Sequence, residues 1–379
     1  MQPYSSSVFF YVIFFFISIV WLVGKKFSSK YFQWLLFLGT ILFTVVAFRS
    51  SSKKIFLFSL FYILIIKLAL SFRNWPRKFF VFMSLIPLIV IKLSEAFPIF
   101  TSLHGKFIFV GISYLSFRVI QILLDIDFYT PQSFLNILVF LLNPLTLLAG
   151  PIDRFHRFEK NIIQINDSIN KNNFISGWYF LLFGLLQKFI LAYFWDQLFM
   201  SQFSVHSAHA SDVIGIAYTY AVYLFLDFSG YSLMAVGLGY MMGIILPQNF
   251  NQPWKTKNPQ DLWRRFHITL GSFLNDYFFK PIYMSFLRKT YFKSHKLFAQ
   301  NLALFLTFLL MGAWNGLKWN YLLSGGMFGL ASVVYNTYQS KYKISQHFLL
   351  TRGPIMIYRF LFLNYVVWAL YFFSGKMPQ

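Results

Sequence analysis

The residues best suited to do chemistry lie in a polar stretch, Gln248 to Tyr277, between apolar runs (QNFNQPWKTKNPQDLWRRFHITLGSFLNDY). Trp263, His267 and Gly271 follow one another at intervals of four residues, which would place them on one face of a helix. Imidazole titrates close to neutral pH, so a histidine can serve there as a general base. With an aromatic residue and a small residue beside it, His267 is expected to line a narrow passage. The alternative is a histidine at the membrane interface that bonds a neighbouring carbonyl group.

A helix is expected to begin shortly before this histidine. Asn258 and Asp261 supply capping side chains, and Pro259 suits a first helical turn. The segment that follows, Ile268–Leu287, is a poor membrane span because polar residues and a proline interrupt it. The interrupting residues are Asn275, Asp276, Tyr277, Lys280 and Pro281. We expect this segment to lie in the interface or to re-enter the membrane without crossing it.

The composition indicates that the surrounding elements are membrane helices. Hydrophobic residues make up 58% of the 379 residues and charged residues only 12%, whereas a soluble domain has about 25% charged residues. Apolar runs approach the roughly 20 residues that a helix needs to cross a bilayer. These runs are Val8–Gly24, Tyr31–Phe48, Ile55–Phe72, Phe79–Leu93, Phe107–Leu124, Phe134–Gly150, Phe174–Met200, Val213–Leu246, Asn301–Ala313, Tyr321–Tyr335 and Pro354–Phe373. The predicted fold is all-α and polytopic, with about 10–12 membrane helices, re-entrant or interfacial segments included, around a central passage. We predict one membrane-embedded domain over 1–379.

Several ionisable residues interrupt the apolar runs at helical spacing. They are Lys92 with Glu95, Arg118 with Asp125, and Lys188 with Asp196. Each pair shares a helix face, and charges inside a membrane usually face the bundle interior or water. Each pair is interpreted either as a structural contact or snorkelling side chain, or as part of a polar cavity.

The run Val213–Leu246 is too long for a simple span. In its middle, Gly230 weakens a helix. The side chains of Asp227, Ser229 and Ser232 could form hydrogen bonds with backbone groups that a break would free. We therefore expect a broken helix or a hairpin that borders a cavity.

Cysteine is absent, which excludes disulfides and a thiolate nucleophile. The formal net charge is +22. Such a balance is expected either of loops that face anionic lipid or of a surface that binds an acidic partner. We see no metal-ligand pattern, and the aromatic residues lie in the spans, so neither a metal site nor nucleic-acid binding is expected.

Six sequence segments in order resemble motifs of the membrane-bound O-acyltransferases, in particular of the branch that transfers D-alanyl groups in teichoic acid biosynthesis. Bacterial polysaccharide O-acetyltransferases are relatives. The first two segments are GISYLSFRVIQILLD and LAGPIDRFHRF. They are followed by DFSGYSLMAVG, PQNFNQP, WRRFHITL and MGAWNG. They cover about residues 111–316, the motif-bearing core.

The resemblance implies a second histidine after the tryptophan of the last motif, and here that position is Asn315. An amide does not titrate near neutral pH, so Asn315 cannot take a proton, although it can donate a hydrogen bond to an oxyanion or a substrate. Of the other histidines considered, His156, His206, His209 and His295 fall in polar loops. The catalytic assignment is therefore His267 as base with Asn315 as orienting donor.

By this resemblance the chain is expected to be a multi-pass protein of a bacterial cell membrane. It would move an acyl group, in the first place D-alanyl, from the phosphopantetheine thioester of an acidic acyl carrier protein. The acceptor would be a hydroxyl group, either of teichoic acid in the cell wall or of a small membrane relay partner. No cofactor is expected to be bound tightly. Expected passage residues are Asp227, Ser229, Tyr231, Trp263, Asn275, Asp276 and Trp314. Expected carrier-docking residues are Lys255, Lys257, Arg264, Arg265 and Lys293. The alternatives are a polysaccharide or cell-wall O-acetyltransferase, and a catalytically impaired relative that acts as a scaffold or transporter.

Overall fold

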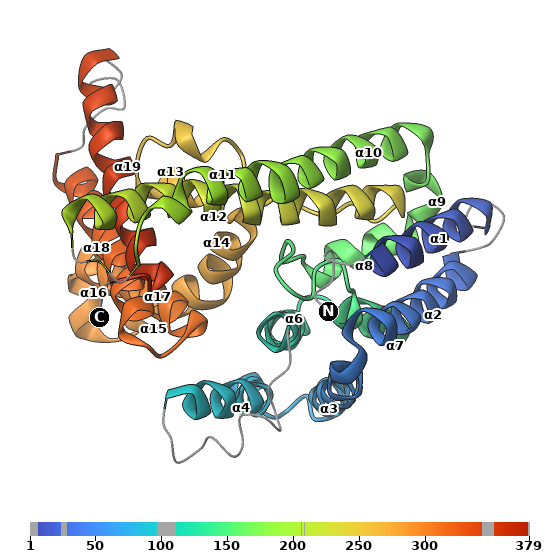
Figure 1. Ribbon diagram of the computed structural model, residues 1–379. Helices are drawn as coiled ribbons and strands as arrows, with labels where there is room; N and C mark the ends of the chain where they lie inside the picture. The colour runs from blue at the N-terminus through green and yellow to red at the C-terminus, as the bar shows by residue number, and fades with distance from the viewer. Residues whose placement is uncertain are drawn as a thin grey trace. The chain divides into compact units, whose positions relative to one another are not determined.

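The computed structural model describes residues 7–23, 29–96, 111–205, 207, 209–342 and 352–377, and this part of the chain contains helices and no strands (Figure 1). The predicted all-helical class is confirmed. The chain divides into two compact units, residues 1–186 with 230–248 (unit 1) and residues 187–229 with 249–379 (unit 2). The prediction of a single domain over 1–379 stays a prediction.

Unit 1 begins with long apolar helices and continues with short ones. Its helices are α1 (Ser7–Val23), α2 (Ser29–Phe48), α3 (Ser52–Ser71), α4 (Arg77–Ala96), α6 (Ile112–Asp125), α7 (Phe134–Leu142), α8 (Phe155–Ile163), α9 (Ile165–Ser168) and α10 (Lys171–Leu185). The last part of α12 (Ala210–Met241) also belongs to unit 1. A Cβ atom added at Gly184 of α10 would lie 2.7 Å from the carbonyl oxygen of Gly230 on α12. Only glycine permits this close approach of the two helices.

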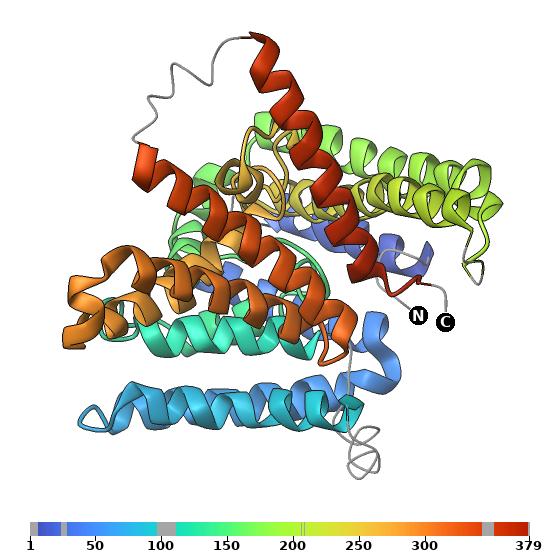
Figure 2. The ribbon, with the colours of Figure 1, turned by 90° about the vertical axis from the view of Figure 1, so that its left-hand side faces the viewer.

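Unit 2 holds the first part of α12 and the helices that follow it. Before α12 come a π-helical segment, η3 (Leu186–Leu191), whose first residue is counted with unit 1, then α11 (Ala192–Leu198) and η4 (Met200–Gln202). After it come η5 (Pro253–Lys255), α13 (Pro259–Trp263), α14 (Ile268–Leu274), the π-helical η6 (Asn275–Phe279), α15 (Lys280–Leu287), α16 (Thr290–Ser294), α17 (Lys296–Asn315), α18 (Trp319–Tyr342) and α19 (Arg352–Ser374). Helix α18 packs along α17 and also contacts α19 (Figure 2).

Six helices of the described residues are long and apolar enough to cross a membrane. They contain Tyr31–Phe48, Ser52–Ser71, Lys171–Gln202, Ala210–Met241, Lys296–Asn315 and Met356–Ser374. A shorter apolar helix covers Val8–Leu22. The segment Ile268–Leu287 is helical but is not among these candidates, in line with its prediction as a poor span.

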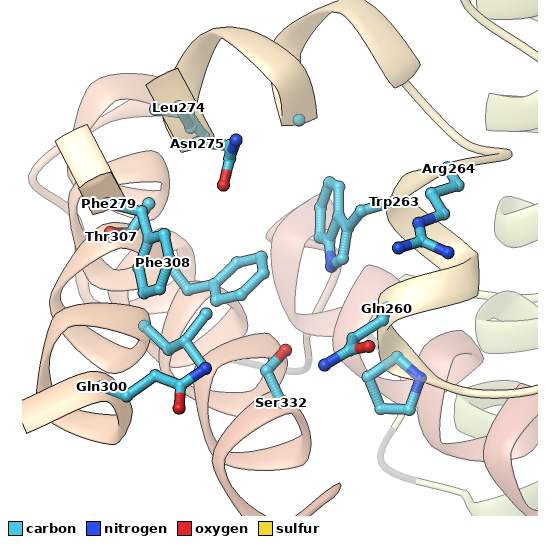
Figure 3. Close-up of a pocket in the computed structure, with 13 residues that line it drawn as sticks. Gln260, Trp263, Arg264, Leu274, Asn275, Phe279, Gln300, Thr307, Phe308 and Ser332 are labelled. Carbon is cyan, nitrogen blue, oxygen red and sulfur yellow. The ribbon is translucent and has the colours of Figure 1, made fainter. Parts of the chain in front are cut away.

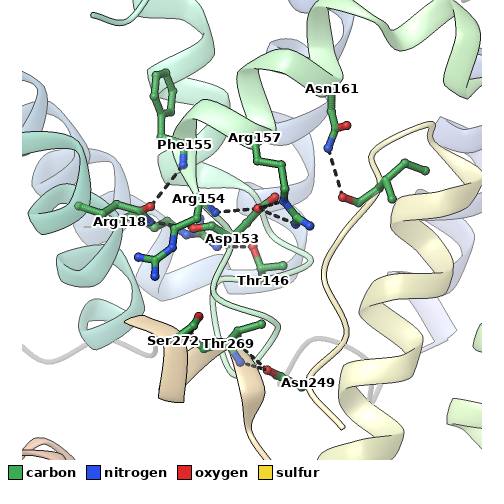
Figure 4. Close-up of polar contacts among 12 residues, drawn as sticks. Arg118, Thr146, Asp153, Arg154, Phe155, Arg157, Asn161, Asn249, Thr269 and Ser272 are labelled. Carbon is green, nitrogen blue, oxygen red and sulfur yellow. Dashed lines mark hydrogen bonds and ion pairs between the residues drawn. The ribbon is translucent and has the colours of Figure 1, made fainter. Parts of the chain in front are cut away.

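Helix α7 has only nine residues, and a charged side chain binds each of its ends. At its start the buried carboxylate of Glu159 accepts hydrogen bonds from the backbone N–H groups of Gln132 and Ser133 and from the side chain of Asn136. At its end the buried guanidinium of Arg118 donates to the carbonyl oxygens of Phe140, Leu141 and Asn143 and to Thr146 (Figure 4). Both charges complement the helix dipole. Arg118 and Asp125 were expected to share a helix face, and of the readings left open for Arg118 the structure shows a structural contact, at the end of α7.

The prediction of a broken α12 is wrong, because Ala210–Met241 is one continuous helix of 32 residues. The polar side chains in its middle do not replace backbone hydrogen bonds. Asp227 forms an ion pair with Lys188, and the hydroxyl of Ser229 donates to Gln187. Lys188 therefore pairs with another helix and not with Asp196. The local pair Lys92–Glu95 forms as predicted, at 3.2 Å.

Candidate functional site

His267 lies in a turn between two helices. Helix α13 ends at Trp263 and α14 begins at Ile268. Between them His267 has φ 48° and ψ 49°, in the left-handed region, which costs a residue other than glycine about 1–2 kcal/mol. The prediction that Trp263, His267 and Gly271 share the face of one helix is therefore wrong. The predicted start of α13 is confirmed, since the Asn258 side chain accepts from the N–H of Asp261 and Pro259 occupies the first turn.

A neighbouring strip of chain holds this turn in place. The N–H of Ile268 donates to the carbonyl oxygen of Asn249 at 2.9 Å, and the N–H of Asn251 donates to that of Arg265 at 2.9 Å. The side-chain oxygen of Asn249 also accepts from the hydroxyl of Thr269 at 2.5 Å and from its N–H at 3.3 Å (Figure 4). Asn249 thus binds the first turn of α14, which has no capping side chain of its own. Two motifs that are separate in the sequence meet here as one structure.

The ring of His267 lies among aromatic rings and is 8% exposed. It meets the ring of Phe228 edge to face, with 4.7 Å between centroids and an angle of 84°. Phe250 packs in the same way against Phe228, at 5.1 Å. Among the described residues, Nδ1 of His267 has no hydrogen-bond partner. His267 lies outside the candidate spans, and burial lowers its pKa to about 3. At neutral pH the imidazole is therefore uncharged.

The other histidines that the structure describes do not offer such a site. His156, His209 and His295 are exposed, and His206 lies outside the described residues. Of the described histidines, His267 alone is buried.

Two predicted passage residues flank Phe228 on α12. Asp227 is bound to Lys188, and Ser229 to the side-chain oxygen of Gln187 at 2.7 Å. Tyr231, also predicted for the passage, belongs to unit 1, where it is buried beside Arg118 and the backbone of Ala149.

A cavity of about 310 Å³ lies within unit 2 and contains two more predicted passage residues, Trp263 and Asn275 (Figure 3). Its lining is Pro259, Gln260, Trp263, Arg264, Gly271, Leu274, Asn275, Phe279, Gln300, Leu304, Thr307, Phe308 and Ser332. Trp263 and Phe308 form one wall, with ring centroids 5.1 Å apart. The buried indole nitrogen of Trp263 has no hydrogen-bond partner among the described residues, and the guanidinium of Arg264 forms no ion pair with them. Since this lining contains donors and no carboxylate, the cavity suits a ligand with carbonyl or anionic oxygens.

Asn315 ends α17, and neither it nor His267 belongs to the lining of that cavity. Its side-chain nitrogen donates to the carbonyl oxygen of Met311 at 2.9 Å. The adjacent Trp314 is partly buried. The hydrogen bond to Met311 orients Asn315 against its own helix.

Asp276, another predicted passage residue, lies on η6, where its carboxylate accepts from Lys280 at 2.8 Å and from Asn275 at 3.1 Å.

Four of the five predicted docking residues are exposed and form no ion pair with described residues. They are Lys255, Lys257, Arg264 and Lys293. Arg265 instead binds Asp261, with 3.0 Å between Nε and Oδ1. The sequence did not indicate the roles of Phe228, Asn249 and Gln187. The only available signal was that Phe228 and Asn249 lie inside the DFSG and PQNFNQP motifs.

The fold and this site define a class: a polytopic helical membrane protein that holds a buried, uncharged histidine and, in the same unit, a cavity rich in hydrogen-bond donors. The chain belongs to the membrane-bound O-acyltransferase family (MBOAT), whose model matches residues 7–343. The predicted family and the O-acyltransferase class are thereby confirmed.

Three relatives illustrate the match. A teichoic acid D-alanyltransferase of Bacillus subtilis is 31% identical over 279 residues, which are 72% of this chain and 70% of that protein. A teichoic acid D-alanyltransferase of Lacticaseibacillus rhamnosus is 34% identical over 236 residues, 59% of this chain and 58% of that protein. A peptidoglycan O-acetyltransferase of Helicobacter pylori is 30% identical over 254 residues, 66% of this chain and 46% of that protein.

Proposed function

We propose that this protein transfers an acyl group, D-alanyl in the first place, from a carrier-protein thioester to a hydroxyl of teichoic acid or of a membrane relay acceptor in a bacterial cell membrane. The observation that carries the proposal is His267, a buried imidazole that is uncharged at neutral pH and whose Nδ1 has no described partner. Acyl transfer to a hydroxyl needs a base near the attacking oxygen. The names of the B. subtilis and L. rhamnosus relatives favour D-alanyl as the group transferred.

In this mechanism His267 accepts the proton of the attacking hydroxyl as the oxygen bonds to the thioester carbonyl carbon. The tetrahedral oxyanion then collapses, the carbon–sulfur bond breaks and the proton passes to the thiolate. Asn315 acts as an orienting donor towards the oxyanion or the substrate, the kind of assistance that a fixed amide can give. The phosphopantetheine arm carries amide carbonyls and a phosphate, which match the free indole N–H of Trp263 and the unpaired Arg264 at the cavity.

The carrier protein would meet the basic residues of unit 2. Lys255, Lys257, Arg264 and Lys293 are exposed and unpaired among the described residues. Acyl carrier proteins are acidic, and such charge complementarity speeds encounter more than it adds affinity. Arg265 contributes less, because Asp261 already binds it.

A second candidate is O-acetyl transfer to a cell-wall polymer. The match to the H. pylori peptidoglycan O-acetyltransferase favours it. The two functions differ in the acyl group and share the demand for a base, so the same site serves either.

A third candidate is an impaired relative that acts as a scaffold or transporter. It is favoured by Asn315, whose side chain donates to its own helix and cannot titrate near neutral pH. Loss of a general base costs about 10²–10⁴-fold in rate.

Ester analysis of wall polymers separates these functions. Cells that carry the parent, His267→Ala or Asn315→His are compared for the amount and identity of ester-linked acyl groups. The proposal expects D-alanyl ester with the parent and its loss with His267→Ala. Acetyl ester supports the second candidate, whereas no ester with the parent and a gain with Asn315→His support the third. An unchanged ester level with His267→Ala refutes the role of His267.

A further inference from the structure

Two polar contacts bind α12 to η3, one on each side of Phe228 in the sequence. Lys188 forms an ion pair with Asp227, and Gln187 accepts a hydrogen bond from Ser229. Phe228, the residue between them, packs its ring against the ring of His267. The residue that contacts the proposed base is therefore fixed through both of its neighbours.

The ion pair lies where charge is costly. Lys188 and Asp227 each lie near the middle of a 32-residue candidate span, Lys171–Gln202 and Ala210–Met241. Their side chains are 23% and 35% exposed. An apolar pair would join two helices at a lower desolvation cost, and ionisable residues within a membrane commonly mark functional sites.

The π-helical geometry of η3 accompanies the double contact. Gln187 and Lys188 are consecutive residues, and both bind α12. Consecutive residues of an α-helix point about 100° apart, and π-helical turns inside α-helices occur frequently at functional sites.

Contacts on both neighbours of Phe228 fix the rotation of α12 about its axis. Side chains reach about 5–6 Å from a helix axis, so a rotation of about 20° would move the Phe228 ring by about 2 Å. That shift is large beside the ring separation of 4.7 Å between Phe228 and His267. A displacement of about 1 Å at a reacting group can cost about a hundredfold in rate.

We propose that Lys188, Asp227, Gln187 and Ser229 form a positioning device that sets the place of the His267 ring through Phe228. The inference rests on the proposed role of His267 in acyl transfer. The four residues are positioning residues, since they act on the base through another side chain.

A double-mutant cycle on purified full-length protein tests the device. Lys188→Gln and Asp227→Asn each leave an unpaired charge, and each is expected to lower kcat by about tenfold to a hundredfold while KM for the acylated carrier stays within about twofold. The double variant places two neutral amides opposite each other and is expected to recover most of the parental kcat. A pair that only stabilises the fold would not split kcat from KM in this way. Glu95→Gln, which breaks the Lys92–Glu95 pair of unit 1, serves as the matched control with parental kcat.

A second measurement does not depend on activity. Diethyl pyrocarbonate modifies accessible histidines, and mass spectrometry gives the rate at each one. His267 is expected to react several-fold faster in either single variant than in the parent or the double variant, while the exposed His295 reacts at one rate in all of them.

The outcomes distinguish the two proposals. Parental kcat and parental His267 reactivity in both single variants, or losses in the double variant that simply add, overturn the positioning device and leave the proposed function standing. A parent without transfer activity overturns the proposed function. The reactivity of His267 then still decides whether the contacts position its ring.

Discussion

Lowering the pH from 7 to 5 is expected to leave the acyl-transfer rate of the parent nearly unchanged. A base must be neutral to accept a proton, and burial holds the pKa of His267 at about 3. With that pKa about 99% of His267 is neutral at pH 5, whereas with the ordinary value near 6.5 only about 3% would be neutral. The structure thus predicts a flat acidic side of the pH profile, whereas an exposed histidine would cause the rate to fall about 25-fold between pH 7 and pH 5.

Phe228→Ala tests the physical cause. Removing this ring opens one face of His267 to solvent, so its pKa is expected to rise toward 6.5 and the rate at pH 5 to fall relative to that at pH 7. The ratio of the two rates within each variant cancels any general loss of activity. Phe292→Ala, which removes a ring stacked on Phe286, is the control and should keep the parental ratio.

The assay is initial-rate transfer from an acylated carrier protein in detergent or nanodiscs between pH 4.5 and 8. A parental profile with a midpoint near pH 6.5 that stays the same in Phe228→Ala would refute the reasoning from burial.

The stability of the fold should respond to pH differently from the transfer rate. As the pH falls below about 6.5, the histidine of the unfolded chain binds a proton while the buried His267 of the folded protein does not. The free energy of unfolding therefore falls by about 2 kcal/mol between pH 7 and pH 5. Thermal unfolding of His267→Asn, whose residue tolerates the left-handed backbone, should lack this loss.

Three further predictions concern single contacts. Asn249→Ala removes the acceptor that binds Thr269 and should lower the free energy of unfolding by about 1–2 kcal/mol, seen as a lower Tm. Asn249→Asp retains an acceptor and should keep most of the parental stability. Equal Tm values for Asn249→Ala and the parent would contradict the capping role. Glu159→Ala leaves several buried or partly buried donors at the start of α7 without an acceptor and should lower the free energy of unfolding by about 3 kcal/mol or more. Glu159→Gln should have a Tm between those of Glu159→Ala and the parent. A parental Tm in Glu159→Ala would show that water replaces the carboxylate. Arg264→Gln should raise KM for the carrier several-fold at low salt with kcat unchanged, and an effect that persists at high salt would argue against charge attraction.

The sequence predicted what depends on composition and on local spacing. The membrane helices follow from hydrophobic content. The start of α13 follows from Asn258 and Pro259, and the pair Lys92–Glu95 follows from a three-residue separation within one helix. None of these depends on the position of another part of the chain.

The errors arose where a distant segment decided the outcome. The spacing of Trp263, His267 and Gly271 fits a helix, but hydrogen bonds with the strip at Asn249 and Asn251 hold a left-handed turn at His267. Asp227 and Ser229 suggested a break in α12, but residues of η3 bind both side chains and the helix continues. Lys188 and Asp196 were expected only to share a helix face, since no sequence pattern shows that Asp227 lies opposite Lys188.

The two charges at the ends of α7 bear on how this protein is made. Nine residues span about 14 Å as a helix, under half of the roughly 30 Å of a bilayer core, so the folded α7 is too short to cross the membrane. Its C-terminal end needs Arg118, which precedes it, and its N-terminal end needs Glu159, which is synthesised 17 residues after Leu142. Until Glu159 has left the ribosome, the donors at the start of α7 lack their acceptor. The maturation of unit 1 is therefore expected to include a late step, after the first spans have been inserted, in which α7 is enclosed between segments on both sides.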